Sequence, residues 1–332
     1  MFDTIAAKFE KGPYLPKDAS RNRWETRTRE FFDSKLGARV TSVVHNLSLP
    51  EVRIAIMGDG GALRFESSLP KFVHGNNLST VIDVTAPLQN LHACIADYVD
   101  GEIPNLDHAD YSRVDYCHNF FVGSALPDYI ATLGSVGFLK HHRVTDAHGA
   151  VEWWNDGRGR MVRVYDKHKE ILDVDKKDVP EAKGALRFEI QLRKKSQFLQ
   201  RRLSKKDLKL EDVLQPRVAY ACLVETINKM GLDVKFIQRD AARDILDVHF
   251  SNRKATRLLG ILRRFESESM DDLKTRTARS TYYADKRDLR VLGLFPPSAG
   301  NSGLPALSLP RFEDLISRPN ARGVDECIPN LS

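Results

Sequence analysis

The chain has 332 residues, of which 42% are hydrophobic and 29% are charged. This composition excludes a disordered or fibrous protein and predicts a globular chain long enough for two domains. The formal net charge of +6 favours a polyanionic partner, although many proteins that bind no polyanion have a similar charge.

The cysteines and the hydrophobic runs exclude several further classes. Cys94, Cys117, Cys222 and Cys327 are scattered without a paired spacing, so we expect free thiols and no zinc site. No stretch approaches the roughly 18 uninterrupted apolar residues of a membrane span. The first residues include acidic side chains and do not resemble a signal peptide. Together these features predict a cytoplasmic protein.

Most of the first 200 residues alternate between apolar and polar side chains, which predicts β-strands. We expect strands at 52–56, 63–65, 112–118, 151–154, 161–167 and 184–192, and a short helix at 126–133. Asn155-Asp-Gly157 indicates a hairpin between two of these strands. The hexamer Gly-Ala-Leu-Arg-Phe-Glu occurs at both 61–66 and 184–189, which indicates either a duplication or a coincidence between two strands.

The pattern changes after the strand at 184–192. Residues 193–206 are rich in lysine and arginine and contain no acid, and helical periodicity then covers 204–231, 253–265 and 279–292. The last part of the chain is rich in proline, glycine and serine. We therefore predict a strand-rich domain at 1–205, a helical region at 206–295 and a loosely ordered tail at 296–332.

Several predicted strands have one apolar side and one side with arginine beside an acid or a tyrosine. The polar sides carry Arg64 and Glu66, then Arg113 and Asp115, then Arg163, Tyr165 and Lys167, then Arg187, Glu189 and Arg193. Paired into one antiparallel sheet, such strands would cover helices with one face and form a basic platform with the other. For one strand alone, an ordinary solvated face with salt bridges is the better explanation of the pattern. Its recurrence on four strands favours a functional site.

Phosphoryl transfer is the chemistry that this set of side chains suits. Asp115 and Glu189 supply the hard oxygen ligands that Mg²⁺ or Mn²⁺ prefers. Tyr165 is the candidate nucleophile. Because tyrosine ordinarily has a pKa of about 10, nearby cations such as Arg163 and Lys167 are needed to favour its phenolate.

Four segments, which occur in the family's order along the chain, resemble the II/X family of phage and plasmid replication initiators. This family includes the gene II protein of filamentous phages. The four segments are His74-Gly-Asn-Asn77, Ser112-Arg-Val-Asp115, Val164–Ile171 and Ala185–Glu189. The family's nicking tyrosine lies in a Tyr-x-Lys-x-x-Glu context, which here is Tyr165, Lys167 and Glu170. The resemblance implies a magnesium-dependent endonuclease that nicks and reseals origin DNA.

The resemblance and the strand pattern together predict an α+β fold, with an antiparallel sheet, helices on one face and a helical C-terminal region, as in replication-initiator nucleases. Tyr165 and Lys167 are then catalytic, and Arg113, Arg163, Arg187 and Arg193 contact single- or double-stranded origin DNA. Residues 270–292 have helix–turn–helix proportions, in which Ser280 caps a helix carrying Lys286 and Arg287. The alternative for these helices is a cap packed on the sheet.

Absent motifs define the remaining alternatives. The chain has no Gly-x₄-Gly-Lys-Ser/Thr motif, so a host helicase is expected to unwind the DNA in the bacterial cytoplasm. It also has no His-x-His pair, the common metal site of other rolling-circle nickases. The sequence predicts no particular oligomeric state. The main rival function is a regulator or repressor that binds the origin without cutting it.

Overall fold

The computed structural model describes residues 1–10, 12–17, 24–33, 38–58, 61–134, 138–139, 141–145, 149–194, 197–230, 232, 239–265, 278–292, 294 and 304–317. Two compact units divide the chain. Unit 1 takes its described residues from Met1–Tyr116 and Gln191–Ala219, and unit 2 takes its own from Cys117–Ile190 and Tyr220–Ser317. The predicted boundary near residue 205 stays a prediction.

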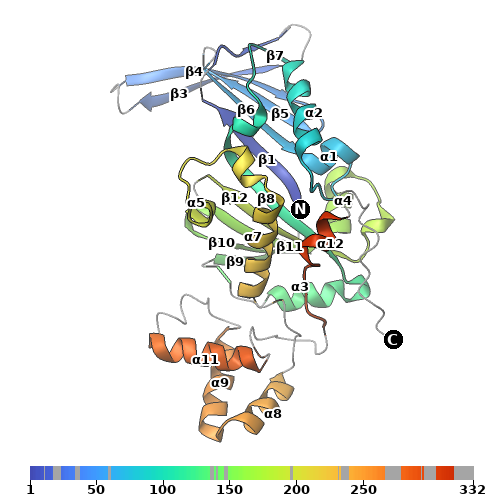
Figure 1. Cartoon of the computed structure of the whole chain (residues 1–332), viewed down its shortest axis with the longest axis vertical. Helices are drawn as coiled ribbons and strands as arrows, with labels where there is room; N and C mark the ends of the chain where they lie inside the picture. Colours follow the sequence, from blue (N-terminus) through green and yellow to red (C-terminus); the bar gives the residue numbers. More distant parts are fainter. Residues whose placement is uncertain are drawn as a thin grey trace. The chain divides into compact units, whose positions relative to one another are not determined.

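A ten-stranded sheet is the main element of the fold (Figure 1). In spatial order its strands are β3 (Glu25–Asp33), β4 (Ala38–Ser48), β5 (Val52–Met57), β6 (Ala62–Ser68), β1 (Phe2–Phe9), β8 (Asp110–Phe121), β12 (Ala185–Arg193), β11 (Arg160–Asp166), β10 (Ala150–Trp154) and β9 (His141–Thr145). The pairs from β3 to β8 and from β11 to β9 are antiparallel. β2 (Leu15–Pro16) pairs separately with β7 (Val99–Asp100). Strands β8 and β12 contribute residues to both units.

Helices account for most of the remaining described residues, and they make the fold α+β, as the sequence predicted. Their bounds are α1 (Leu69–His74), α2 (Thr85–Ala96), α3 (Leu126–Gly134), α4 (Lys167–Asp175), α5 (Gln197–Leu203), α6 (Leu210–Val213), α7 (Pro216–Met230), α8 (Arg239–His249), α9 (Asn252–Phe265), α11 (Arg279–Val291) and α12 (Phe312–Ile316). None of these described helices is long and apolar enough to cross a membrane.

The core of unit 1 forms because its strands alternate at period two, as the predicted strand at 52–56 does. Ile54 and Ile56 of β5 and Leu63 and Phe65 of β6 are buried, whereas Arg53 and Arg64 between them are exposed. Burial of the apolar side removes it from water and fixes the register, since a one-residue slip would turn the arginines inward.

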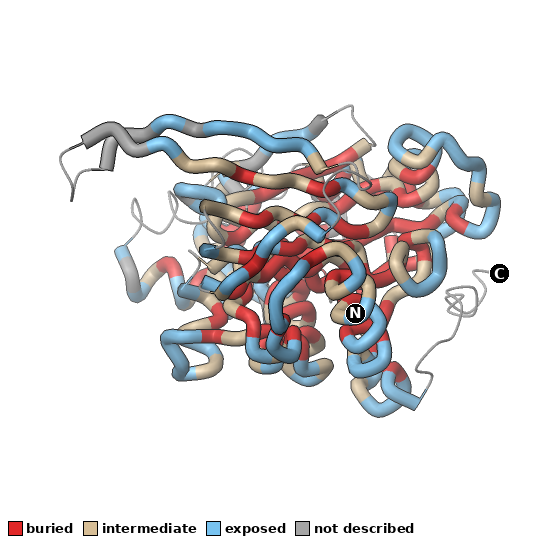
Figure 2. Tube along the Cα trace, turned by 90° about the horizontal axis from the view of Figure 1, so that it is seen from above, coloured by how far each residue is buried: buried red, intermediate tan, exposed pale blue. Residues whose placement is uncertain are grey.

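The predicted platform is enclosed at strand β12 in unit 2. Leu186, Phe188 and Ile190 are fully buried on one side, and Arg187 and Glu189 on the other side are 0% and 3% exposed. The central strands are accordingly drawn largely in red in Figure 2. Alternation in the sequence predicted which residues share a side, but it did not predict that both sides would be covered.

The repeated hexamer lies on two strands of the same sheet, as the sequence suggested, but in different surroundings. Strands β6 and β12 are separated by β1 and β8. Arg64 of β6 is exposed, whereas the equivalent Arg187 of β12 is fully buried. Identical local sequences therefore form strands in both places, and their neighbours decide how far the side chains are buried. A duplication as the origin of the repeat stays a prediction.

Helices α8, α9 and α11 form a hydrophobic cluster of their own within unit 2. Its members include Leu246, Leu258 and Leu289, all fully buried. The helix predicted at 253–265 is confirmed as α9, and the one at 279–292 as α11. Helix α11 begins at Arg279, so Ser280 lies inside it and does not cap it. The other helix of the predicted helix–turn–helix, at 270–273, lies outside the described residues.

Residues 304–317 of the predicted tail belong to unit 2 and pack against its other residues. Tyr129 donates a hydrogen bond to the carbonyl oxygen of Pro305 at 2.7 Å, and Tyr220 donates to that of Pro310 at 3.0 Å. The backbone amide of Leu307 donates to the carbonyl of Leu232 at 2.7 Å. These bonds satisfy polar groups that a chain lying over an apolar surface would otherwise leave without partners.

Gly184, just before β12, provides a test of this packing. Its φ of +77° disfavours other residues, and a Cβ atom there would lie 2.6 Å from the Cα atom of Gly123. We expect Gly184→Ala to lower the free energy of unfolding by about 2–5 kcal/mol, from backbone strain plus overpacking. The control is Gly157→Ala, where φ is +70° but no atom lies within 4 Å of the added Cβ, so the cost is only about 1–2 kcal/mol. Equal losses in urea melts would contradict this account.

Candidate active site

The register of β9, β10 and β11 brings polar side chains of unit 2 onto one side of the sheet. Glu152 of β10 lies opposite Arg143 of β9 and opposite Arg163 of β11. Directly opposed residues in an antiparallel pair point to the same side, and Tyr165 follows Arg163 by two residues along β11. Val151, Trp153, Val162 and Val164 point to the other side and are 0% exposed, which anchors the three strands.

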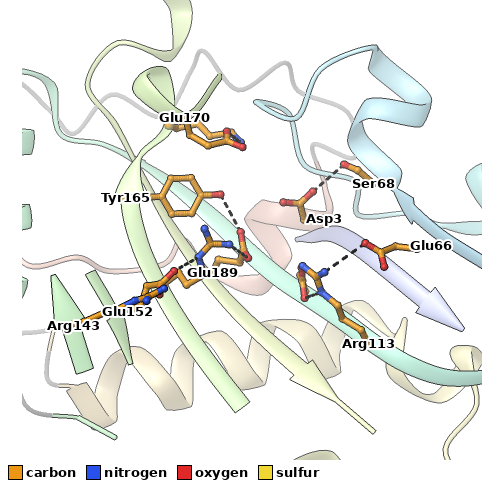
Figure 3. Close-up of polar contacts among 12 residues, drawn as sticks. Asp3, Glu66, Ser68, Arg113, Arg143, Glu152, Tyr165, Glu170 and Glu189 are labelled. Carbon is orange, nitrogen blue, oxygen red and sulfur yellow. Dashed lines mark hydrogen bonds and ion pairs between the residues drawn. The ribbon is translucent and has the colours of Figure 1, made fainter. Parts of the chain in front are cut away.

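Tyr165 is hydrogen-bonded to Glu189 of β12 (Figure 3). Its hydroxyl donates to Glu189 Oε2 at 3.0 Å, and Arg163 Nη1 lies 3.5 Å from Glu189 Oε1. Tyr165 and Glu189 are both only 3% exposed. The carboxylate therefore binds a phenol through one oxygen and an arginine through the other, which satisfies a charge that would be costly to bury alone.

Arg163 links this pair to the outer strands. Its Nε atom lies 3.2 Å from Glu152 Oε1, and Arg143 Nη2 lies 2.7 Å from Glu152 Oε2. The Arg163 guanidinium carbon is also 5.2 Å from the centre of the Tyr165 ring, within the range of a cation–π interaction. A continuous chain of charges thus runs from Arg143 through Glu152, Arg163 and Glu189 to the hydroxyl of Tyr165.

Lys167 reaches Tyr165 from a helix, and its prediction as a strand residue is wrong. Strand β11 ends at Asp166, whose Oδ1 accepts a hydrogen bond from the amide of Lys169 at 3.1 Å and caps α4. Lys167 therefore begins α4. Its Nζ atom is fully buried, 2.7 Å from Glu170 Oε2 and 5.7 Å from the centre of the Tyr165 ring. The expected proximity of Lys167 to Tyr165 is confirmed, but it arises from the start of α4 and not from a shared side of a strand.

Asp115 and its partner Arg113 belong to unit 1, whereas Glu189 belongs to unit 2. Arg113 forms an ion pair with Asp115 on the same strand, and Arg113 Nη1 lies 3.6 Å from Glu66 Oε1. Each predicted metal ligand is thus already paired with an arginine, and the described part of the chain has no group of three or more His, Cys, Asp or Glu side chains that could hold a metal ion. This donor set does not fit a ready-made Mg²⁺ site. Metal dependence therefore stays a prediction.

The arginines and lysine predicted to contact DNA differ widely in exposure. Arg193 is exposed, and the side chains of Arg113 and Arg163 are each 25% exposed. Arg187 is fully buried and donates to Asn119 Oδ1 at 3.3 Å. On α11, Arg287 is exposed, and Lys286 Nζ lies 5.9 Å from the centre of the Tyr282 ring.

Sequence reasoning missed two members of the charge chain and one basic helix. Arg143 and Glu152 were not singled out, although Glu152 and Arg163 lie on the two strands of the predicted hairpin. Helix α9 has five basic residues and no acidic residue, and its apolar residues pack in the α8–α9–α11 cluster. The charge of α9 was visible in the sequence, but its exposed side could be identified only once its buried side was known.

Residues 18–210 match the family Phage_CRI, described as the N-terminal part of a replication-associated protein. The chain belongs to this family. The match covers more than half of the chain and contains the Tyr165 network, and it confirms the resemblance to gene II-like replication initiators of filamentous phages. Helices α8, α9 and α11 lie beyond the matched residues. No curated protein matches the chain.

His118, next to Asn119 on β8, allows the burial of this strand to be tested by lowering the pH. Burial lowers its pKa from 6.5 to about 3, so the folded chain keeps this ring neutral while the unfolded chain protonates it below pH 6.5. The contribution of neutral His118 is therefore present above pH 6.5 and is lost as the pH falls toward 3. We expect the free energy of unfolding to fall less steeply over this range in His118→Gln than in the wild type. A wild-type slope in His118→Gln would contradict the assignment.

Proposed function

We propose that the protein initiates rolling-circle DNA replication by nicking one strand at the origin through Tyr165 and later rejoining the ends. Membership of a replication-associated family supports the role. The hydrogen bond from Tyr165 to the buried Glu189, with two cations beside the ring, is the observation that carries the chemistry. Other tyrosines are held differently: those at 116, 129 and 220 donate to backbone carbonyls, which are poor proton acceptors.

In this proposal Glu189 is the general base. Its carboxylate already accepts the hydrogen bond of Tyr165, so the phenolic proton can pass along that bond as the oxygen attacks. Arg163 is the partner of Glu189 with the longer contact and with an exposed portion. A phosphodiester that arrives from solvent attracts Arg163, since guanidinium binds phosphate through two parallel hydrogen bonds. Its departure opens access to the tyrosine and removes the cation that competes for the carboxylate of Glu189.

The bonds exchanged in the reaction balance without an external energy source. Tyr165 Oη forms a bond to phosphorus, the bond from phosphorus to the 3′ oxygen breaks, and that oxygen takes a proton from water. The 5′ end remains on the tyrosine as a phosphodiester. Attack by a 3′ hydroxyl on this linkage reverses the steps and seals the strand, and Glu189 then returns its proton to Tyr165.

Lys167 supports the tyrosine without giving up a proton. Its ammonium is buried against Glu170 and lies close to the Tyr165 ring, where it stabilises the charge that develops on the phenolic oxygen. Lys167 begins α4, and the hydrogen-bonded cap of this helix fixes its backbone.

We include origin DNA, a host helicase, a bacterial cytoplasmic location and Mg²⁺ in the proposal as the corresponding partners, setting and cofactor.

The nucleophile is tested by Tyr165→Phe. We expect wild-type protein to convert supercoiled DNA carrying the cognate origin into relaxed circles with protein attached at the 5′ end, and the variant to form no attached product. Removal of the hydroxyl deletes the attacking atom but keeps the ring that packs in the site. The measurement is gel electrophoresis after protease treatment, with mass spectrometry of the DNA-linked peptide.

Tyr129→Phe is the matched control, because it removes another buried hydroxyl of unit 2 that donates one hydrogen bond. Each variant should lose about 1 kcal/mol of folding free energy, so only the nicking assay should separate them. Covalent attachment in Tyr165→Phe would contradict the assignment. Wild-type protein that shifts the origin DNA on a gel and never cuts it would favour the rival function, a non-catalytic regulator.

The general base is tested by Glu189→Gln. The amide keeps the shape of the carboxylate but accepts a proton poorly, so the single-turnover nicking rate should fall about 10²- to 10⁴-fold with DNA affinity unchanged. Glu152→Gln is the control, since it disrupts the ion pairs with Arg143 and Arg163 without touching the hydroxyl of Tyr165. A larger loss of rate in Glu152→Gln than in Glu189→Gln would assign the network a positioning role only.

A further inference from the structure

A tryptophan surrounded by cations lies on the same side of the sheet as Tyr165. The ring of Trp154, at the end of β10, is 5.7 Å from the guanidinium carbon of Arg143 and 5.5 Å from that of Arg158. The ring of His141 stacks on it with centres 5.8 Å apart and planes 22° apart. None of these contacts takes part in the proposed nicking chemistry.

The register shows why Trp154 belongs to the polar side. It lies opposite His141 of β9 and opposite Met161 of β11, and it follows Glu152 by two residues. Trp153, its neighbour along the strand, points to the other side and is 0% exposed. Trp154 is only partly buried, and the side chain of Arg143 is 54% exposed. Two adjacent tryptophans therefore have separate roles, with one in the core and the other at the surface.

Arg158 has an unusual backbone conformation beside this ring. Its φ is +50°, in the left-handed region where a residue with a side chain is uncommon. Glycine would relieve this strain, yet the sequence has arginine, whose exposed side chain reaches Trp154. A strained position that carries a cation to an aromatic ring is a reason to look for a ligand there.

We propose that Trp154 is a stacking platform for a base of single-stranded DNA next to the nick, with Arg143 and Arg158 bound to the flanking phosphates. The inference rests on the proposed function and names how the cut strand is held. An incoming base replaces the Arg158 guanidinium on the tryptophan ring, and the arginine moves to a phosphate. An aromatic ring among cations is the arrangement that binds single strands without regard to sequence.

Single-stranded DNA suits this surface better than duplex DNA does. A duplex keeps its base faces stacked inside, whereas a separated strand presents them to a flat side chain. The platform also lies close to the nucleophile along the sheet. Trp154 is opposite Met161, and Met161 precedes Tyr165 by four residues of β11, or about 13 Å at the usual rise of a strand. Arg143 further joins the platform to the nucleophile through Glu152, Arg163 and Glu189.

The first experiment measures binding of a fluorescein-labelled oligodeoxythymidylate to the full chain by fluorescence anisotropy. Loss of one stacked base predicts that Trp154→Ala binds about 5- to 150-fold more weakly than the wild type. Trp154→Phe retains a flat ring and should recover most of the affinity. Trp153→Phe is the matched control, which should lower the melting temperature and leave binding unchanged. Arg158→Gly should weaken binding without lowering the melting temperature.

The second experiment crosslinks the same oligonucleotide, substituted with 5-iodouracil, by irradiation and maps the attached peptide by mass spectrometry. Attachment at Trp154 supports the proposal. Wild-type affinity in both Trp154→Ala and Trp154→Phe, or attachment only elsewhere, would overturn it.

Two readouts separate the platform from the nicking function: oligonucleotide binding and nicking of origin DNA, each measured on the wild type and on the Trp154 variants. If the wild type binds the oligonucleotide through Trp154 but never nicks origin DNA, the nicking function fails and the platform stands. If nicking proceeds while substitutions at Trp154 leave binding unchanged, the platform alone fails.

Discussion

The structure around the candidate site depends on one buried carboxylate. Glu189 lies on a central strand with both sides covered, and it accepts the hydrogen bond of Tyr165 while pairing with Arg163. A charge in such a position is tolerated only when its oxygens are satisfied, so Glu189 keeps both partners as long as no other group replaces one of them. Tyr165 keeps its position because its hydroxyl supplies one of the contacts that Glu189 needs.

This arrangement joins stability and reactivity in one set of contacts. The network is neutralised internally when no DNA is present, because two arginines and two glutamates alternate between Arg143 and Glu189. A phosphate group that binds at the exposed side of this network adds a negative charge and competes for the same arginines. On the proposed function, DNA binding and activation of Tyr165 thus become a single electrostatic event, and the tyrosine remains covered in the absence of a substrate.

Local patterns in the sequence predicted much of the sheet but not how its strands are covered. Alternation located β5, β6, β8, β12 and the β10–β11 hairpin, and it placed Arg163 and Tyr165 on one side. It failed at Lys167, because the hydrogen-bonded cap at Asp166 ends the strand one residue earlier than periodicity suggests. The assignment of Asp115 and Glu189 to one metal site stays a prediction. Which strands are neighbours, and that Glu189 of β12 binds Arg163 and Tyr165 of β11, depends on strand pairing that no local pattern contains.

The junction at Asp166 has a mechanical consequence. Tyr165 is the next-to-last residue of a strand, and the following residue caps a helix, so its backbone is fixed on both sides. On the proposed function, the 5′ end attached there has no freedom to swivel, whereas the released 3′ end can rotate about the intact strand. Superhelical tension would then dissipate through one end only, and the other end would wait at a constant position for resealing.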